Sequence, residues 1–74
     1  MVFGYLKNLL SEQFACDEDD IELTSLLDDL NLTDSDRAEI AFILSEHYGV
    51  EISDSQVEEF STVEDIVACV EDQL

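Results

Sequence analysis

Ser35 is the side chain best placed to carry a chemical group. It follows Thr33 and Asp34 at the start of residues 33–48, a stretch that contains no glycine or proline before Gly49. Three consecutive residues able to cap a helix, followed by such a stretch, predict a helix that begins here. The amino end of a helix carries partial positive charge and free N–H groups, which favour a phosphate on the Ser35 hydroxyl. The alternative is that Ser35 only caps the helix or is solvated at its start.

The other reactive side chains form no catalytic or metal-binding set. Cys16 and Cys69 are isolated thiols without CxxC spacing, and His47 is the single histidine, so we expect neither a disulfide scaffold nor a zinc site. The acidic run 17–20 lacks the glycine and the distal glutamate of a calcium-binding loop, and it is either a solvated loop or an interaction site. Because the sequence offers no pair of nucleophile and base, we expect no enzyme activity.

The charge of the chain restricts its partners. The 74 residues include 20 Asp and Glu but only Lys7 and Arg37 as cations, which gives a formal net charge of −18. Such a chain repels nucleic acid and anionic membranes, whereas it attracts a protein that has a basic patch. We also expect salt or divalent cations to stabilise the fold, because they screen the self-repulsion.

The length of the chain predicts one domain, residues 1–74, since so short a chain buries only about 60% of its unfolded surface. We expect this domain to be a monomer. No segment approaches the ~20 apolar residues of a membrane span, and residues 1–10 lack the features of a signal peptide. Together with the isolated cysteines, these features predict a cytoplasmic protein.

The spacing of apolar residues predicts two long helices joined by a long connection. Residues 2–14 and 33–48 repeat apolar side chains at intervals of three and four, which is the pattern of an amphipathic helix. Gly49 is placed to end the second helix in a left-handed conformation. The connection over residues 15–31 is too apolar for a free loop, so we expect it to lie on the core. Its apolar side chains are Ile21, Leu23, Leu26, Leu27 and Leu30, with Leu32 just after them.

Two shorter helices follow the central one. Ser53 or Asp54 is predicted to cap a helix over residues 55–59. The last helix opens after residues 61–62 and keeps an apolar repeat as far as Leu74. These elements predict an all-α fold, a small four-helix bundle with a long first loop and a short third helix.

The helix over residues 33–48 has two different faces at about 100° per residue. The predicted buried face consists of Ile40, Ile43, Leu44 and Tyr48, and the opposite row consists of Ser35, Glu39, Phe42 and Glu46. A large aromatic on an acidic outward row is either an isolated surface residue or a contact for partners. Arg37 is expected to pair with carboxylates on adjacent turns, and His47 to lie at the boundary of the buried face.

Four short motifs stand in order along the chain. They are Asp29-Leu30, Asp36-Arg37-Ala38-Glu39-Ile40, Tyr48-Gly49-Val50-Glu51-Ile52 and Phe60-Ser61-Thr62-Val63. In their order, spacing and acidity they resemble the acyl carrier protein family. The resemblance covers nearly the whole chain and implies a four-helix bundle of acyl-carrier type. It also implies a phosphopantetheine arm on a serine at the start of the second helix, which holds an acyl intermediate of fatty acid or polyketide biosynthesis as a thioester.

The chain departs from the family pattern at the attachment site. The family has Asp-Ser-Leu before Asp-Arg-Val-Glu-Leu, whereas this chain has Thr33-Asp34-Ser35 there. Without a gap, Asp34 occupies the position of the modified serine, and aspartate has no hydroxyl to accept a phosphodiester. A slip of one residue instead makes Ser35 the attachment site for 4'-phosphopantetheine. This slip moves the attachment point about 100° around the helix and about 1.5 Å along it.

Two functions follow from the resemblance. The first is an acyl carrier with its arm on Ser35, served by a phosphopantetheinyl transferase and by acyl-processing enzymes. The second is an acyl-carrier-like interaction protein without the arm, which uses the acidic helix only for docking. The basic patches of partners are expected to dock on Asp36, Glu39, Phe42 and Glu46.

Overall fold

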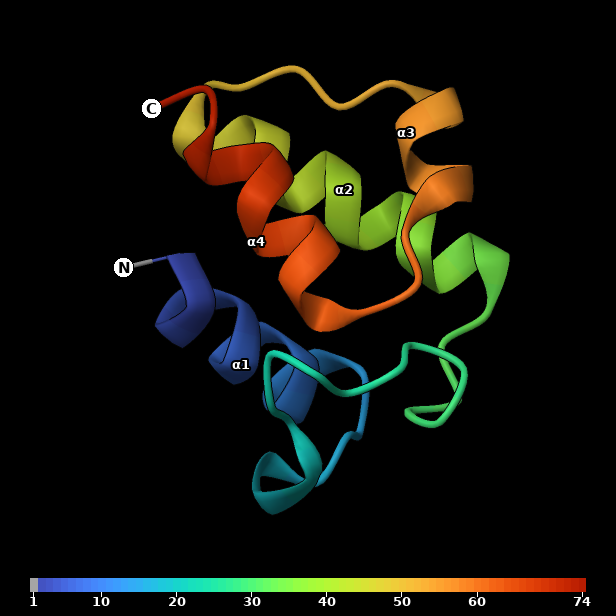
Figure 1. Cartoon of the computed structure of the whole chain (residues 1–74). Helices are drawn as coiled ribbons and strands as arrows, with labels where there is room; N and C mark the ends of the chain where they lie inside the picture. The colour runs from blue at the N-terminus through green and yellow to red at the C-terminus, as the bar shows by residue number, and fades with distance from the viewer. Residues whose placement is uncertain (1) are drawn as a thin grey trace.

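Four α-helices and one 3-10 turn are the regular elements of the computed structural model, which describes residues 2–74 (Figure 1). In chain order they are α1 (Val2–Gln13), the 3-10 turn η1 (Glu18–Asp20), α2 (Asp34–Tyr48), α3 (Asp54–Glu59) and α4 (Val63–Glu71). Helix α4 packs against both α1 and α2, and the short α3 packs against α2. The predicted four-helix fold with a long first loop and a short third helix is confirmed.

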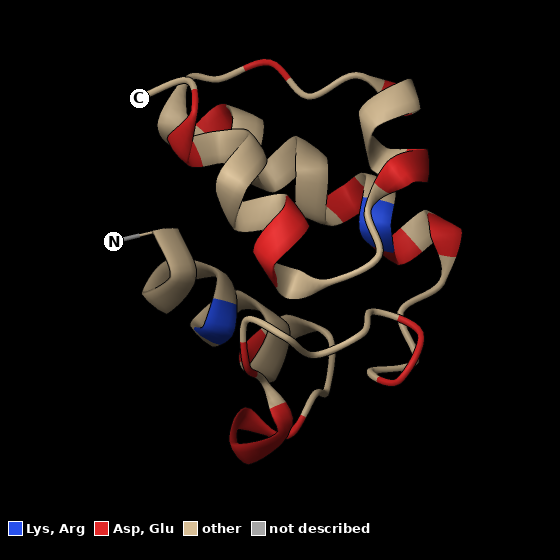
Figure 2. Cartoon of the chain, in the orientation of Figure 1, with Lys and Arg blue, Asp and Glu red and all other residues tan. Residues whose placement is uncertain are grey.

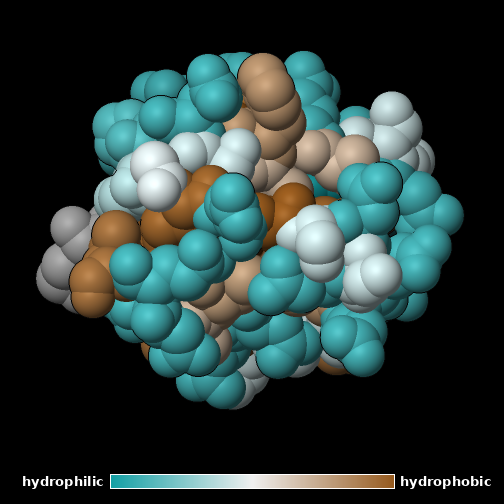
Figure 3. Space-filling view, turned by 90° about the horizontal axis from the view of Figure 1, so that it is seen from above, coloured by the Kyte–Doolittle hydropathy of each residue, from teal (hydrophilic) through white to brown (hydrophobic). Residues whose placement is uncertain are grey.

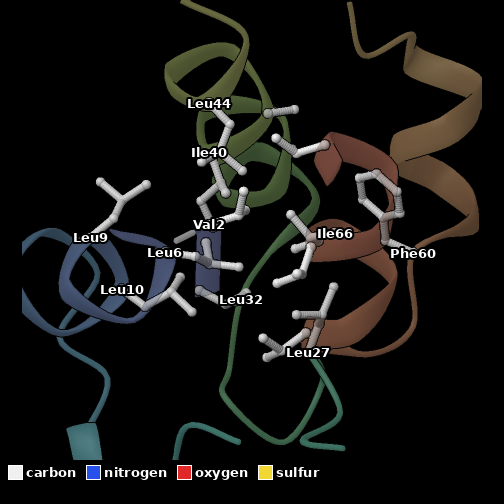
Figure 4. Packing of buried hydrophobic residues seen from close by; sticks show 14 of the residues in the cluster. Val2, Leu6, Leu9, Leu10, Leu27, Leu32, Ile40, Leu44, Phe60 and Ile66 are labelled. Atoms are coloured by element: carbon white, nitrogen blue, oxygen red, sulfur yellow. The ribbon is translucent and has the colours of Figure 1, made fainter. Parts of the chain in front are cut away.

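The core is aliphatic apart from one aromatic ring. Leu6 of α1, Ile40 and Leu44 of α2, and Ile66 of α4 are at most 1% exposed, and Figure 4 shows their side chains gathered between the helices. Phe60 is the one buried aromatic among residues 2–74. Over the same residues no polar or charged residue is buried, so the carboxylates stay in contact with water. A carboxylate buried without a partner would be strongly destabilising.

The connection between α1 and α2 lies on the core, as predicted. Its residues Ile21, Leu27 and Leu32 are at most 4% exposed. The Leu27 N–H also donates to the Ser61 carbonyl at 2.9 Å, which joins the connection to the segment before α4. The acidic run within it forms the single turn η1, whose residues are all exposed.

Two apolar side chains of this connection do not pack inward as expected. Leu23 and Leu26 are 38% and 47% exposed. The Leu23 carbonyl accepts the N–H of Glu64 at 2.9 Å, and Leu26 forms an isolated antiparallel bridge with Thr62. Because the backbone of these residues faces the start of α4, their side chains are left at the surface.

Capping boxes begin α2, α3 and α4. The N-cap residues are Thr33, Ser53 and Thr62, and each side chain accepts the N–H of the third helical residue. The side chain of that third residue accepts the N-cap N–H in return, so two of the unpaired donors at each helix start are satisfied. Ser53 therefore caps α3, which begins at Asp54, one residue earlier than predicted. Gly49 ends α2 at φ 67°, in the left-handed conformation expected for it.

The terminal helices are shorter than predicted. Helix α1 ends one residue before Phe14, and α4 ends at Glu71, so the apolar repeat does not continue to Leu74, which is 69% exposed. Just after this helix end, the Gln73 side chain bonds to the backbone of Glu51: its Nε2 donates to the carbonyl at 2.7 Å and its Oε1 accepts the N–H at 3.0 Å. Within residues 2–74 no helix has the length and apolar character needed to cross a membrane.

Asp65 contributes a pH-dependent part of the stability. Its carboxylate accepts the N–H groups of Ser61 at 2.9 Å and Thr62 at 3.0 Å, and these bonds lower its pKa. Because the pKa is lower in the folded state, the stabilisation is present above the unfolded pKa of about 4 and is lost as the pH falls through the folded value. We expect urea denaturation to show a constant stability difference between wild type and Asp65→Asn from about pH 7 to about pH 5, and a smaller one below about pH 4.

Glu64→Gln provides the matched control, since Glu64 is the neighbouring acid in the first turn of α4 and makes none of these capping bonds. It removes the same charge as Asp65→Asn, so the general effect of net charge cancels between the two variants. A stability difference for Asp65→Asn that tracked the Glu64→Gln difference at every pH would contradict the capping role.

Candidate functional site

The start of α2 has two backbone N–H groups left over after capping. The Thr33 Oγ1 accepts the Asp36 N–H, and the Asp36 Oδ2 accepts the Thr33 N–H, both at 3.1 Å. These bonds use two of the four donors that a helix start leaves without an intrahelical acceptor. The other two belong to Asp34 and Ser35. Together with the partial positive charge of the helix end, they can hold an anionic group such as a phosphate.

Ser35 is the second residue of α2, and it is exposed. Because Thr33 is the N-cap residue, Ser35 does not cap the helix. Its hydroxyl is therefore not required by the helix start and is open to solvent.

The row opposite the core is exposed along its whole length, as predicted. We call this row, consisting of Ser35, Glu39, Phe42 and Glu46, the outer row. Phe42 is 65% exposed, although it is a large aromatic flanked by carboxylates. The outer row thus combines one apolar contact with two anionic side chains and a hydroxyl at its amino end.

The opposite face of α2 fixes the direction of the outer row. Ile40 and Leu44 are fully buried, and Ile43 and Tyr48 are half-buried against the core. Ala41 is also buried, which the apolar pattern did not indicate because alanine is weakly apolar. Since these side chains hold one face of α2 in the core, the outer row is fixed toward solvent.

Asp36 has a structural task at this site. It is partly exposed, and one of its carboxylate oxygens accepts the Thr33 N–H in the capping box. The spacing Thr-x-x-Asp is the sequence signal for this role, although Glu or Gln is the more usual partner. A cation on a partner protein therefore meets a carboxylate that is already used by the helix start.

Arg37 does not pair as the sequence predicted. Its guanidinium reaches Asp28 in the long connection, and its Nε donates to the Leu32 carbonyl at 3.2 Å. The prediction that Arg37 pairs with carboxylates on adjacent turns was wrong, because the connection folds back to place Asp28 beside α2. Figure 2 shows the Arg37 segment as the one basic patch on α2, bordered by acidic residues. Because the Arg37 guanidinium already pairs with Asp28, it is not free to bind a phosphate.

A groove separates the amino half of α2 from α3. Its lining residues are Asp34, Arg37, Ala38, Asp54, Val57 and Glu58. Asp34 lines this groove and Ser35 does not, so the two candidate attachment positions point to different surroundings. An arm on residue 34 would begin at the groove, whereas an arm on Ser35 begins on the outer row.

His47 packs against aromatic rings rather than near Ser35. Its ring stacks on Tyr5 of α1 with centroids 3.9 Å apart and contacts the Tyr48 ring edge-on at 4.7 Å. His47 is exposed although its ring contacts Tyr5 and the half-buried Tyr48, so it lies further toward solvent than the predicted boundary position. Burial, followed by the charges of Tyr5 and Glu71, raises the pKa of Tyr48.

Both cysteines are free thiols and half-buried. Burial raises the pKa of each thiol, and the nearby carboxylates of Asp36, for Cys16, and Asp72, for Cys69, raise it further. A raised pKa keeps a thiol protonated and weakly nucleophilic. Among residues 2–74 no cluster of three His, Cys, Asp or Glu side chains is placed to hold a metal ion.

Comparison with known proteins identifies the family. The family model described as "Phosphopantetheine attachment site" matches residues 4–70. An acyl carrier protein of Coprothermobacter proteolyticus is 35% identical, over 99% of this chain and 90% of that protein. The chain belongs to the acyl carrier protein family. Acyl carrier proteins of Phytoplasma australiense and Thermotoga maritima are 36% and 32% identical, over 100% and 99% of this chain and 99% and 91% of theirs.

Membership in the acyl carrier protein family determines the class of function. Acyl carrier proteins carry substrates for acyl-processing enzymes and are not enzymes themselves, and the phosphopantetheine attachment domain spans nearly all of this chain. The predicted family is thereby confirmed, and so is the prediction that the chain is a carrier or interaction protein and not an enzyme.

Arg37→Gln should loosen the long connection while leaving α2 helical. The substitution removes the charge that holds Asp28 and weakens the bond to the Leu32 carbonyl. Because Asp28 is largely exposed, we expect backbone amides of residues 28–32 to exchange only about two- to fivefold faster, as for a weak surface ion pair. Hydrogen exchange followed by NMR measures this change.

Lys7→Gln is the control, since it removes the other cation of the chain without touching residues 28–32. Equal acceleration in both variants would mean that net charge, rather than the contact between Arg37 and Asp28, governs the connection.

Proposed function

We propose that this acyl carrier protein bears 4'-phosphopantetheine on Ser35 and presents an acyl intermediate to enzymes of fatty acid or polyketide biosynthesis. When attached, the arm supplies the thiol that forms the acyl thioester. Residues 1–74 act as one carrier domain and as a monomer. The exposed Ser35 hydroxyl, on the outer row and beside two N–H groups not used for capping, is the main support for this function.

The backbone at the start of α2 suits a phosphodiester on Ser35. The N–H groups of Asp34 and Ser35 can donate to phosphate oxygens, and the helix end adds partial positive charge. Arg37 would contribute little, because its guanidinium is bound to Asp28. The carboxylates of Asp34 and Asp36 repel the phosphodiester, which favours an arm that extends away from the protein toward partners.

Local sequence alone does not distinguish Ser35 from a second serine. Residues 53–56 repeat the pattern of residues 33–36, and Ser55 is likewise the exposed second residue of its helix. The two helices differ in length, because α2 has 15 residues and α3 has 6. Only α2 continues from its serine into a row that contains Phe42. A transferase that docks along this row reaches Ser35 and not Ser55.

An acyl-carrier-like interaction protein without the arm is the second candidate. Asp34 occupies the ungapped family position of the modified serine, and it also lines the groove between α2 and α3. Ser35 lies outside that groove. If transferases require the hydroxyl at the groove, the chain keeps the fold and the docking face but carries no acyl group.

The docking face is proposed to be the outer row together with Asp36. Phe42 offers an apolar side chain that a partner can cover, and Glu39 and Glu46 lie on the same row. A covered aromatic contributes most of the contact energy, while the carboxylates speed encounter with a basic patch. Interface carboxylates also select against acidic partners, because like charges repel.

The arm is tested by modification in the presence of a broad-specificity phosphopantetheinyl transferase and its phosphopantetheine donor. We expect intact mass to increase by one phosphopantetheine in the wild type and not in Ser35→Ala. Ser55→Ala is the matched control, because Ser55 has the same helix position in α3, and it should be modified like the wild type. No increment with several transferases would support the armless protein.

A variant that contains Asp34→Ser distinguishes attachment at position 34 from attachment at Ser35. In the double variant Asp34→Ser with Ser35→Ala, the only hydroxyl at this pair of positions stands at the ungapped family position. If the transferase tolerates the slip, the wild type and this variant are both modified. Modification of the double variant alone would overturn Ser35 as the attachment site.

Phe42→Ala combined with Glu39→Lys should weaken binding of a basic partner. The variant removes the apolar contact and reverses one charge of the outer row. Both residues are exposed, so thermal unfolding should change little. We expect the dissociation constant for the transferase to rise by about tenfold or more. Surface plasmon resonance at a fixed salt concentration measures this change.

The combination Leu26→Ala with Glu18→Lys makes the same types of change at exposed positions of the long connection. It should leave binding close to that of the wild type. Equal weakening by the two combinations would place the interface outside the outer row or reduce it to net charge.

A further inference from the structure

A second surface feature lies away from the outer row, in a hollow between the α2–α3 link, α3 and α4. Its apolar lining includes Ile52 of the link, Phe60 after α3, and Ala68 and Cys69 of α4. Phe60 is buried, whereas Ile52 and Cys69 are half-buried. Figure 3 looks onto the face that the link crosses at the top of Figure 1, and it shows an apolar band between hydrophilic side chains.

Hydrogen bonds hold the sides of this hollow in place. The Gln73 side chain bonds to both the N–H and the carbonyl of Glu51, and its Nε2 also donates to the Cys69 carbonyl at 3.3 Å. These bonds join the link to the end of α4. On the other side, the capping box of Ser53 and Gln56 fixes the start of α3. A preformed surface loses little conformational entropy when a partner binds.

The charged residues around the hollow are all acidic. They are Glu51, Glu59, Asp65 and Asp72, which we call the rim. The Asp65 carboxylate accepts two backbone N–H groups and so stays ionised at neutral pH. Neither cation of the chain belongs to this lining, because Lys7 lies over the Phe3 ring of α1 and Arg37 binds Asp28. The rim therefore attracts cations from another molecule.

We propose that this hollow is a second docking surface, which binds a basic amphipathic segment of a partner protein. An apolar side chain of the segment would cover Ile52, Phe60 and Cys69, while its Lys or Arg side chains would meet the rim. A second copy of the chain does not suit the surface, because two molecules of charge −18 repel each other. This surface goes beyond the proposed carrier function, since its contacts do not involve Ser35 or the outer row.

The probe is a synthetic amphipathic helix of about 16 residues with leucines on one face and lysines on the other. Cys69 reports on the hollow, and Cys16, which lies after α1 and bonds to the Leu30 carbonyl, is the internal control. With the peptide at about ten times its dissociation constant, we expect iodoacetamide to alkylate Cys69 about tenfold more slowly. Alkylation of Cys16 should not change.

Charge reversal on the rim gives a second and independent readout. Glu59→Lys with Asp72→Lys should raise the dissociation constant of the peptide by about tenfold. Glu12→Lys with Glu18→Lys is the matched control, because it changes net charge equally at exposed positions outside the hollow. Both double variants keep the capping acid Asp65, and circular dichroism checks their folding.

Several results would overturn the proposal. A scrambled peptide of the same composition that protects Cys69 equally would reduce the effect to charge alone. Equal weakening by the two double variants, or NMR shifts confined to residues 35–46, would place the peptide elsewhere. Protection of Cys69 by decanoic acid but not by the peptide would make the hollow an acyl cavity, and protection that rose with protein concentration would make it a contact between copies. None of these outcomes depends on modification of Ser35, so they are separate from the test of the carrier.

Discussion

The repulsion among twenty carboxylates is the constraint on which the rest of the structure depends. To stay compact, the chain must bury enough apolar side chains to offset this repulsion, while each carboxylate keeps contact with water. The structure meets this condition with a core of leucine, isoleucine and valine drawn from α1, α2 and α4. Two of the carboxylates stabilise helix starts, where Asp36 and Asp65 accept backbone N–H groups. A charge that opposes folding globally thus supports it locally.

The same constraint gives α2 two different faces. One face is held in the core by Ile40 and Leu44, so the helix cannot rotate and the outer row has a fixed direction. An acidic surface of fixed direction can select basic partners by charge and orient them by shape. Phe42 of this row is 65% exposed, so it contributes less to the stability of the domain than a buried aromatic would. Its exposure is understandable if partners cover it.

Local features of the fold could be predicted from the sequence, whereas features that depend on distant segments could not. The helices, the short runs of capping residues from which Thr33 and Ser53 cap them, and the left-handed Gly49 all follow from patterns within a few residues. Which residue of each run is the cap was left open by the sequence. The pairing of Arg37 with Asp28 required knowledge of how the long connection returns to α2.

The hydrogen bonds between the Gln73 side chain and the Glu51 backbone likewise join residues 22 positions apart. Helix α4 ends at Glu71, and Leu74 beyond it is exposed. An apolar repeat counts such a residue as core, because the pattern cannot show where the last helix ends against the rest of the fold. The exposed side chains of Leu23 and Leu26 have a similar cause, since their backbones pair with the start of α4.

The candidate site shows why an attachment serine cannot be recognised from its helix position alone. Residues 33–36 and 53–56 have nearly the same chemistry and the same capping geometry, yet they begin helices of very different length. Only the longer helix has one face held in the core and, opposite it, a continuous exposed row that a partner can follow to the serine. If Ser35 is modified as proposed, specificity comes from the row and not from the hydroxyl. A shift of one residue at the start of α2 changes which surface the attached group leaves from, while the docking row stays where the core has fixed it.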